Sequence, residues 1–377
     1  MFNCQRKMTK QFSISKSARL RSTPFTDLIE EQGVKSYTVY NHMLLPTVFE
    51  GIEDDCEHLK NFVQLWDVSV ERQIEISGPD SSKLVQMMTC RNLSKAIEGT
   101  CYYAPIIDEK GFIINDPLIM LVDKNSWWIS IADSDVLLYA KGLATGLNLE
   151  VIINEPNINP LAVQGPKSFE LMEKIFGPTI LDLKFFRFNK FVFDGHSFLI
   201  SRSGWSKQGG FEIYVNDNEK GRKLYRELMN QGKNLNVRAG CPNLIERIEG
   251  GLLSYGNDMT IEDNILECGL DDFVSFSDEI EYLAKDHLIN LASKGIKQSL
   301  TGIKIYSEYF SLNHHLPIFF DGEKIGELRS LVYSPKFKCC LGITMINKEF
   351  QSKKGIQDLV IDNSTYKVEI SSLPFSQ

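Results

Sequence analysis

Residues 203–215 read Ser-Gly-Trp-Ser-Lys-Gln-Gly-Gly-Phe-Glu-Ile-Tyr-Val, and an apolar run, Phe-Leu-Ile-Ser, precedes them at 198–201. Alternating residues on both sides of closely spaced glycines predict a β-hairpin. Gly209 and Gly210 suit positions with positive φ or with another group packed against the backbone. The turn carries an aromatic ring, an ammonium and an amide, and Glu212 lies on the returning strand between apolar neighbours. Such a hairpin alone is more often an ordinary solvated turn than a binding loop, so its meaning depends on the rest of the chain.

The composition is that of a globular protein with two or three domains. Of the 377 residues, 43% are hydrophobic and 24% are charged, and no apolar run reaches the roughly 18 residues of a membrane span. A net charge of −8 argues against non-specific binding to nucleic acid or to anionic membranes. The segment 1–21 is basic and serine-rich without an apolar core, which excludes a secretory signal and favours a cytosolic tail over a transit peptide.

The sequence predicts neither a metal site nor a nucleotide-phosphate loop. Eight cysteines are dispersed without a CxxC pair, and the adjacent pair at 339–340 lies in an apolar run. None of the six histidines is spaced with acidic residues or cysteines as in zinc or iron sites. No Walker loop and no GxGxxG motif follows a predicted strand. Dispersed thiols favour a reducing compartment, so we expect a cytoplasmic protein.

Predicted strands and helices follow one another irregularly along the chain, which indicates an α+β fold. Apolar residues at helical spacing predict helices at 56–65, 80–88, 136–146, 167–176, 220–231 and 244–251. Predicted strands fall at 36–50 (with a break), 65–69, 72–77, 102–107, 111–122, 127–132 and 161–166. Phenylalanines at 185–188 and 191–193 predict a further hairpin. From about residue 290, short strands with turns favour a small β-barrel or sandwich.

Six motifs occur in one order along the chain. They are Leu65-Trp-Asp-Val-Ser69, Gly111-Phe-Ile-Ile-Asn-Asp116, Leu161-Ala-Val-Gln-Gly-Pro166, Gly204 to Glu212, Arg247 to Leu252 with Tyr255 to Asp258, and Ile325 to Ser330 with Ser334-Pro335. Each is weak alone, but together they make residues 35–350 resemble the folate-dependent aminomethyltransferases, the T-proteins of glycine cleavage, and their relatives. The resemblance implies a three-domain ring, or cloverleaf, with a central folate site and a C-terminal β-barrel.

The same resemblance implies the domain bounds. They are 1–58 with 156–240 for a discontinuous first folate-binding domain, 59–155 for a second α+β domain, 241–290 for a helical connection and 291–377 for the barrel. Four runs, at 37–46, 129–135, 182–188 and 206–214, are most similar to the demethylases of this superfamily that act on dimethylsulfoniopropionate.

These demethylases transfer a methyl group from the sulfonium to tetrahydrofolate and form 5-methyltetrahydrofolate and methylmercaptopropionate. The implied partners are therefore two small molecules, with no nucleic acid, membrane or metal, and a homodimer stays open. The sulfonium is already activated by its charge, so alignment of two bound substrates can supply much of the rate.

The resemblance assigns roles to four polar or aromatic residues near the folate. Asp116 aligns with the acidic residue beside the reacting nitrogens and would accept the proton that N5 sheds, although it could instead cap a bend. Tyr103, unlike Tyr102, has a counterpart near the pterin, and a core aromatic is the alternative. Glu212 would accept from the pterin's amino and ring N–H donors. Gln208 replaces a glutamate of the aminomethyltransferases and could still hydrogen-bond the pterin as an amide.

Aromatic and charged residues are candidates for the donor site. Trp205, Tyr37, Tyr40 and Phe25 could form an aromatic wall around the sulfonium, because ring faces attract cations, but we expect at least two of the four to be core residues. Cations that could meet the substrate carboxylate or the folate glutamate tail are Lys207, Arg202 and Arg72. The resemblance also places Asp133 and Ser134 at a ligand-facing register after a strand.

Two positions at which the sequence differs from the aminomethyltransferases leave other functions open. Besides Gln208, Asn243 stands where they typically have an arginine, four residues before Arg247. Arg247 could pair with Glu246 or Glu249, or anchor a carboxylate. The rival functions are an aminomethyltransferase or folate-dependent amine demethylase, which the change at Gln208 disfavours, and a non-catalytic folate-binding protein, which the retention of Asp116 disfavours.

Overall fold

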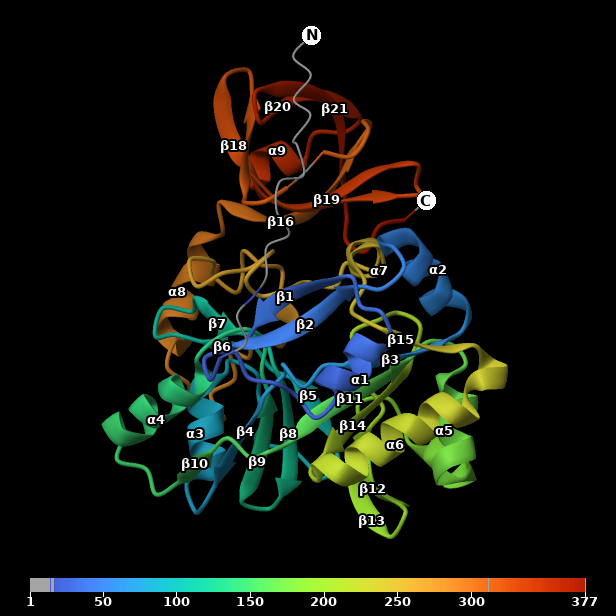
Figure 1. The fold of residues 1–377 in the computed structure, drawn as a ribbon. Helices are drawn as coiled ribbons and strands as arrows, with labels where there is room; N and C mark the ends of the chain where they lie inside the picture. The colour runs from blue at the N-terminus through green and yellow to red at the C-terminus, as the bar shows by residue number, and fades with distance from the viewer. Residues whose placement is uncertain (1–13, 15–16, 311, 377) are drawn as a thin grey trace.

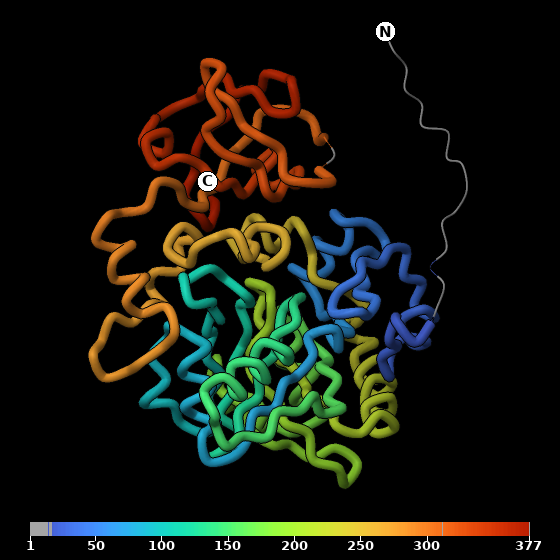
Figure 2. The backbone as a smooth tube through the Cα atoms, turned by 90° about the vertical axis from the view of Figure 1, so that its left-hand side faces the viewer, coloured from blue at the N-terminus to red at the C-terminus, as the bar shows by residue number. Residues whose placement is uncertain are grey.

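A computed structural model describes residues 14, 17–310 and 312–376 of the chain. The basic segment at 1–21 therefore lies mostly outside the described residues. The fold is α+β, as predicted, and has three parts, with the C-terminal part above two sheet-containing parts (Figure 1). The same arrangement is visible from the side, where segment 241–290 runs between the upper and lower parts (Figure 2).

The first part is built on a six-stranded sheet. Its strands, in spatial order, are β12 (Phe188–Phe193), β13 (His196–Ser201), β14 (Gly210–Val215), β11 (Asn159–Gln164), β3 (Val63–Asp67) and β15 (Val237–Gly240). All neighbours are antiparallel except β15 and β3. Helices α1 (Thr26–Glu31), α5 (Ser168–Phe176) and α6 (Asn218–Gln231) pack on it around an apolar core. Short 3-10 helices follow at η1 (Pro178–Asp182) and η2 (Lys233–Leu235).

The second part is built on a five-stranded sheet. Its strands, in spatial order, are β10 (Ile152–Asn154), β4 (Gln73–Ser77), β9 (Ser126–Ser130), β8 (Leu118–Asp123) and β5 (Cys101–Tyr103). Helices α3 (Ser81–Met88) and α4 (Val136–Gly146) cover it. The predicted boundary at residue 59 precedes β3, but β3 pairs with β11 in the first sheet. We therefore propose that the second domain begins after β3.

Two small sheets complete the lower half. The hairpin of β1 (Ser36–Tyr40) and β2 (Met43–Val48) crosses the front between the two large sheets (Figure 1). Strands β6 (Ile106–Ile107) and β7 (Ile113–Asn115) form the other. The single hairpin expected from 102–107 and 111–122 is thus divided, since β5 pairs with β8 and β6 with β7. Pro105 and Pro117 lie at the breaks and lack the N–H that a continuous ladder needs.

The C-terminal part is a closed six-stranded barrel, as predicted. Its strands are β16 (Gln298–Ile305), β19 (Cys339–Asn347), β18 (Glu323–Ser334), β17 (Leu316–Phe320), β20 (Ile356–Ile361) and β21 (Ser364–Ser371), with α9 (Lys348–Gln351) after β19. The connection expected at 241–290 contains α7 (Leu244–Glu249), η3 (Asp271–Phe273) and the start of α8 (Lys285–Lys294), and much of it is irregular. Helix α2 (Ile52–Asn61) contacts α7.

Two local predictions were wrong. The phenylalanine-rich hairpin does not form, because Phe191 and Phe193 both lie on β12, which pairs with β13. The turn is Asp194-Gly195, whose φ angles of 51° and 71° suit a tight hairpin turn. The helix expected at 56–65 begins and ends four residues earlier, and residues 63–65 belong to β3.

The opening hairpin is confirmed, with a wide connection rather than a tight turn. Strands β13 and β14 pair from Leu199 with Tyr214 to Ser201 with Glu212. Residues 202–209 join them as an eight-residue loop, which we call the 202–209 loop. All six residues of β14 are buried, so Glu212 lies on a buried strand at the middle of the sheet.

Candidate functional site

Asp116 lies in the two-residue connection between β7 and β8, and the preceding residue fixes its position. The Asn115 side chain is fully buried. Its Nδ2 donates to the Ala132 carbonyl at 3.0 Å and to Ser134 Oγ at 2.8 Å, and its Oδ1 accepts from the Ala132 N–H at 2.9 Å. Ser134 Oγ in turn donates to the Ile114 carbonyl at 2.8 Å. Ser134 thus supports the connection that carries Asp116.

The Asp116 carboxyl is suited to proton transfer. The Tyr103 hydroxyl donates to its Oδ2 at 3.1 Å. Burial raises the pKa of Asp116 to about 7, with a further increase from Asp258, although the Tyr103 hydrogen bond opposes the shift. A carboxyl with a pKa near 7 exchanges protons readily at neutral pH. The alternative of a simple bend-capping aspartate does not explain its contact with the Tyr103 phenol.

Glu212 is a second carboxyl of the site, and it is buried. It accepts hydrogen bonds from the Ser203 hydroxyl and, at 3.4 Å, from the Tyr214 hydroxyl. Burial raises its pKa, while these hydroxyls favour the ionised form. Ser203 lies in the 202–209 loop, so the loop and the sheet strand both contribute to the surroundings of this carboxyl.

Glu71 is a third carboxyl of the site, and the sequence reasoning missed it. It lies in the loop between β3 and β4. Burial raises its pKa well above the usual range, and the charges of Glu212 and Asp116 add to this increase. No motif includes Glu71, and its local sequence predicts only a turn before a strand. The packing of the first two parts of the fold brings it within electrostatic reach of the other two carboxyls. We call Glu71, Asp116 and Glu212 the carboxyl cluster.

Tyr40 joins the carboxyl cluster from the β1–β2 hairpin. Burial raises the pKa of its phenol well above the usual value, and the charges of Glu71, Asp116 and Asp133 act in the same direction. The Asp133 Oδ1 accepts the Asn41 N–H at 2.7 Å and so ties the hairpin turn to the second part of the fold. Asp133 therefore supports Tyr40, as Ser134 supports Asp116.

The other two aromatic candidates of the N-terminal region lie elsewhere. Phe25 is fully buried in the apolar core of the first part, 5.8 Å from the Tyr225 ring, so its expected role in the donor site is corrected to core packing. Burial raises the pKa of Tyr37 to about 12, with contributions from Glu30 and Asp67 and not from the carboxyl cluster.

Tyr102 also points away from the carboxyl cluster. Its hydroxyl accepts the N–H of Ile97 at 3.0 Å, and the Arg91 guanidinium lies 5.5 Å from its ring centre. Tyr103, and not Tyr102, therefore reaches Asp116, while its place near a pterin stays a prediction.

The 202–209 loop is fixed against the sheet beneath it by Gln164. Ser206 Oγ donates to Gln164 Oε1 at 2.8 Å, and Gln164 Nε2 donates to the Ser203 carbonyl at 3.2 Å. A Cβ atom at Gly204 or Gly210 would overlap the Gln164 amide. Gly204 also has a φ of 145°, so a larger residue there would be strained as well as crowded.

Trp205 connects the loop to the surroundings of Asp116. The Arg247 guanidinium lies 6.0 Å from the Trp205 ring centre. Arg247 Nη1 donates to Asp258 Oδ2 at 2.8 Å, and Nη2 donates to Ser330 Oγ at 2.7 Å. Asp258 is the residue whose charge helps to raise the pKa of Asp116. The expected pairing of Arg247 is thus corrected, since its partner is Asp258 and neither neighbouring glutamate of α7.

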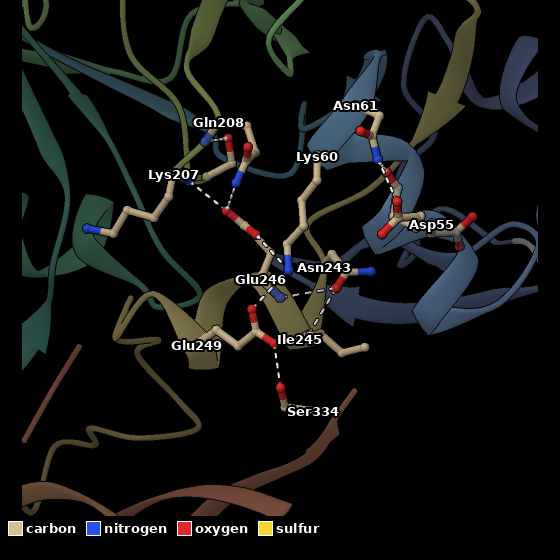
Figure 3. A network of polar contacts seen from close by, with 12 residues as sticks. Asp55, Lys60, Asn61, Lys207, Gln208, Asn243, Ile245, Glu246, Glu249 and Ser334 are labelled. Carbon is tan, nitrogen blue, oxygen red and sulfur yellow. Dashed lines mark hydrogen bonds and ion pairs between the residues drawn. The ribbon is translucent and has the colours of Figure 1, made fainter. Parts of the chain in front are cut away.

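Gln208 contacts the helix α7. Its Nε2 donates to Glu246 Oε1 at 2.9 Å, and the backbone N–H of Lys207 donates to the same oxygen at 3.0 Å (Figure 3). Lys60 Nζ lies 3.9 Å from Glu246 Oε2 and 2.9 Å from Glu249 Oε2. Glu246 is only 4% exposed, so one buried carboxylate holds the end of the 202–209 loop.

Asn243, the second departure from the aminomethyltransferases, begins α7. Its Oδ1 accepts from the N–H groups of Ile245 and Glu246 at 2.9 and 3.2 Å, which makes it the N-cap of the helix (Figure 3). Its Nδ2 donates to the Ile52 carbonyl at 2.8 Å. The residue therefore supports the helix that holds Gln208.

Two of the three candidate cations already contact other protein groups. Arg72 pairs with Glu155, and Arg202 donates to the Leu183 carbonyl at 3.1 Å and lies over the Phe169 ring. Lys207 is exposed, and its side chain points away from the Glu246 network (Figure 3). Its ammonium makes no ion pair with any residue that the structure describes.

Three features of the described residues bear on other functions. No set of three or more histidine, cysteine or acidic side chains is arranged there to hold a metal ion. No described helix has the length and apolar character needed to span a bilayer. Two surface hollows, of about 690 and 650 Å³, lie beside α3 and α2 and are not lined by the carboxyl cluster.

The combination of two sheet-containing parts and a C-terminal barrel is the fold of the T-protein class. The chain belongs to this glycine cleavage T-protein family. Its residues 25–278 match the GCVT N-terminal domain and 299–377 match the glycine cleavage T-protein C-terminal barrel domain.

Similar proteins include a demethylase and aminomethyltransferases. The chain is 44% identical to dimethylsulfoniopropionate demethylase DmdA of Ruegeria pomeroyi, over 89% of this chain and 92% of that protein. It is 28% identical to an aminomethyltransferase of Natranaerobius thermophilus, over 94% of this chain and 98% of that one. The crystal structure of the glycine cleavage system aminomethyltransferase T from Bartonella henselae has the same fold. Its TM-score is 0.84 at 19% identity, over 95% of this chain and 98% of that chain.

Proposed function

We propose that this protein is a tetrahydrofolate-dependent methyltransferase that demethylates dimethylsulfoniopropionate to methylmercaptopropionate and forms 5-methyltetrahydrofolate. The observation that carries the proposal is the 44% identity to a dimethylsulfoniopropionate demethylase over 89% of this chain. The carboxyl cluster and the nearby phenol ring of Tyr40 support this proposal, because carboxylates and aromatic rings both stabilise a cation such as a sulfonium. The sequence composition supports a cytoplasmic enzyme that uses no metal.

Asp116 would act as the proton acceptor. Tetrahydrofolate supplies the N5 amine, so a C–N bond forms, the C–S bond breaks with its electron pair on sulfur, and one proton must leave N5. The pKa of about 7 lets Asp116 be ionised before transfer and protonated after it. Tyr103 would keep the carboxyl oriented through its 3.1 Å hydrogen bond.

The chain also has groups that fit a pterin. Glu212 is a buried acceptor with two oxygens, and its neighbours Ser203 and Tyr214 leave it acceptor capacity for amino and ring N–H donors. Trp205 would cover the ligand from the 202–209 loop. Gln208 would act through Glu246, by keeping this loop in place, instead of by direct contact with the folate.

The donor would be held at both of its charged ends. Tyr40 and the carboxyl cluster would surround the sulfonium, and Asp133 and Ser134 would support them through the contacts described above. Lys207, whose ammonium has no ion pair among the described residues, would bind the donor carboxylate or the folate glutamate tail.

Incubation of the pure protein with dimethylsulfoniopropionate and tetrahydrofolate tests the proposal. We expect stoichiometric formation of 5-methyltetrahydrofolate and methylmercaptopropionate. Activity only with a methylamine or an aminomethyl carrier would make the protein an amine demethylase or an aminomethyltransferase. Folate binding without turnover of any donor would make it a non-catalytic folate-binding protein.

A further inference from the structure

The turn of the β1–β2 hairpin, which directly follows Tyr40, contains one buried asparagine. The two strands pair as far as Tyr40 with Met43, so Asn41 and His42 form a two-residue turn. Both turn residues have positive φ angles, of 49° and 62°, as a tight hairpin turn requires. The His42 side chain is exposed, whereas Asn41 is only 4% exposed. A buried amide needs hydrogen-bond partners, and Asn41 finds them outside the hairpin.

Three hydrogen bonds of Asn41 join the hairpin turn to other segments. Its Nδ2 donates to the Val70 carbonyl at 2.9 Å and to the Ala132 carbonyl at 3.0 Å. Its backbone N–H donates to Asp133 Oδ1 at 2.7 Å. Val70 follows strand β3, and residues 132–133 follow strand β9. The turn is therefore held to the two large sheet-containing parts and not by its own strand pairing alone.

The carbonyl of Ala132 is also the acceptor for a second buried asparagine. Asn115 Nδ2 donates to it at 3.0 Å, and Asn115 Oδ1 accepts the Ala132 N–H at 2.9 Å. The Ser134 N–H donates to the same carbonyl at 2.9 Å. A shift of this peptide would thus disturb the hydrogen bonds of Asn41 and Asn115 together.

We propose that Asn41 is a positioning residue for methyl transfer, which sets Tyr40 relative to Asp116 through the Ala132 carbonyl. This inference rests on the proposed function, in which Tyr40 helps to hold the sulfonium and Asp116 accepts the proton from N5. Asn41 directly follows Tyr40, and Asn115 directly precedes Asp116, so the shared carbonyl links the two groups through short pieces of backbone. Methyl transfer depends on such alignment, because a misplacement of about 1 Å can cost about 100-fold in rate.

The hydrogen bonds also predict which half of the site depends on Asn41. Without the Asn41 amide, Asn115 keeps its bonds to the Ala132 N–H and to Ser134 Oγ, so Asp116 stays in place. The groups that fit a pterin lie on β14 and in the 202–209 loop, whereas Asn41 bonds to residues 70, 132 and 133. Loss of the amide should therefore affect the methyl donor and spare the binding of folate.

The Asn41→Gly variant removes the amide and keeps the turn, because glycine readily adopts a positive φ. We expect kcat/KM for dimethylsulfoniopropionate, at saturating tetrahydrofolate, to fall by about 10- to 100-fold, since two hydrogen bonds of ordinary strength are lost. The Kd of tetrahydrofolate should not change. The matched control is His42→Gly, which alters the exposed residue of the same turn and should change neither quantity. Equal losses in both variants, or equal losses toward both substrates, would show a merely structural role and overturn the proposal.

A double-mutant cycle with Tyr40 tests whether Asn41 acts through this ring. In the Tyr40→Leu background, Asn41→Gly should lower kcat/KM by less than about threefold, because no ring remains to be positioned. An undiminished loss in that background would refute the role of Asn41 in placing Tyr40. An active parent protein with an unaffected Asn41→Gly variant would refute this inference alone, whereas a parent protein that does not turn over the donor would refute the proposed function.

A second variant, Asn41→Asp, keeps the question open to measurement if Asn41→Gly does not fold. Aspartate has nearly the same shape and tolerates the left-handed backbone, but its ionised carboxylate cannot donate to the carbonyls of Val70 and Ala132. We expect kcat/KM for the donor to fall by at least about tenfold, again with an unchanged Kd of tetrahydrofolate. Donor turnover equal to that of the parent protein would contradict the proposal, since the lost N–H donors would then have no function.

Discussion

Replacement of Gln208 by glutamate should release the 202–209 loop from α7. In the present structure Gln208 Nε2 donates to Glu246 Oε1 at 2.9 Å, and the Lys207 N–H shares that oxygen. Gln208→Glu replaces this donor by an ionised oxygen of nearly the same shape. The only cation that the described residues place near Glu246 is Lys60, at 3.9 Å, and Lys60 is closer to Glu249.

The expected loss of loop-docking free energy follows from the lost hydrogen bond to Glu246 and the new repulsion between two carboxylates. A hydrogen bond to a charged acceptor contributes about 1.5–3 kcal/mol. Two like charges about 4 Å apart repel by about 4 kcal/mol at the effective dielectric constant of a protein surface. Gln208 is partly exposed and can turn toward solvent, and Lys60 offsets part of the repulsion. We therefore expect loop docking to weaken by about 2–4 kcal/mol, or about 30- to 1,000-fold.

Initial rates with both substrates measure the effect. We expect Gln208→Glu to raise the KM of at least one substrate by 30-fold or more, with a partial recovery at low pH as one carboxyl becomes protonated. The double variant Gln208→Glu/Glu246→Gln should recover most of the loss, because an amide at 246 can donate to the new carboxylate and still accept from the Lys207 N–H. Gln231→Glu is the matched control, since Gln231 donates to Glu227 at 2.7 Å on the exposed face of α6. Unchanged KM values in Gln208→Glu, or a double variant no better than the single one, would refute the reasoning.

The remaining predictions concern the proton acceptor and the buried ion pair. Asp116→Asn should lower kcat by about 10²–10⁴-fold with little change in the dissociation constant of folate, and equal losses in both would argue against a catalytic role. Because Asp116 must be ionised to accept a proton, the rate should rise with pH through about 7, and a profile without this step would contradict the assignment. Asp258→Ala leaves the Arg247 guanidinium buried without its partner, so the free energy of unfolding in urea should fall by about 3–5 kcal/mol. A loss below 1 kcal/mol would show that Ser330 and the Leu252 carbonyl suffice for Arg247.

Local sequence patterns predicted most of the helices and strands and some residues of the candidate site. The alternation around residues 203–215 predicted the pairing of β13 and β14, and the short strands after residue 290 predicted the barrel. The family resemblance assigned Asp116, Tyr103 and Glu212 to one folate site, and the structure shows a hydrogen bond between Tyr103 and Asp116, while the folate contacts stay predictions. Motifs shared with a family indicate which segments lie together in the fold. Hydrophobic periodicity predicts single helices and strands but not these tertiary contacts.

The sequence alone does not predict which side chains of distant elements pair with one another. Glu71 has no local signal, because a turn glutamate before a strand is usually solvated, and only the packing of two sheets makes it a member of the carboxyl cluster. Phe25 looks equally suitable for a core and for an aromatic wall, since both use the same apolar ring. Arg247 had two acidic neighbours on its own helix, yet it pairs with Asp258 across an irregular segment.

Strand β18 of the barrel contacts the ion pair of Arg247 and Asp258. Ser330 on β18 donates to Asp258 Oδ1 at 2.5 Å and accepts from Arg247, so the barrel helps to hold the cation beneath Trp205. The preceding residue of β18, Arg329, donates twice to the Asp263 carboxylate, at 2.7 and 3.0 Å. These buried pairs lose much of their interaction energy if the barrel shifts, because each partner would be left uncompensated. Strand β18 therefore helps to fix Arg247 and Asp258, which contribute to the surroundings of Trp205 and to the raised pKa of Asp116, the proton acceptor that we propose.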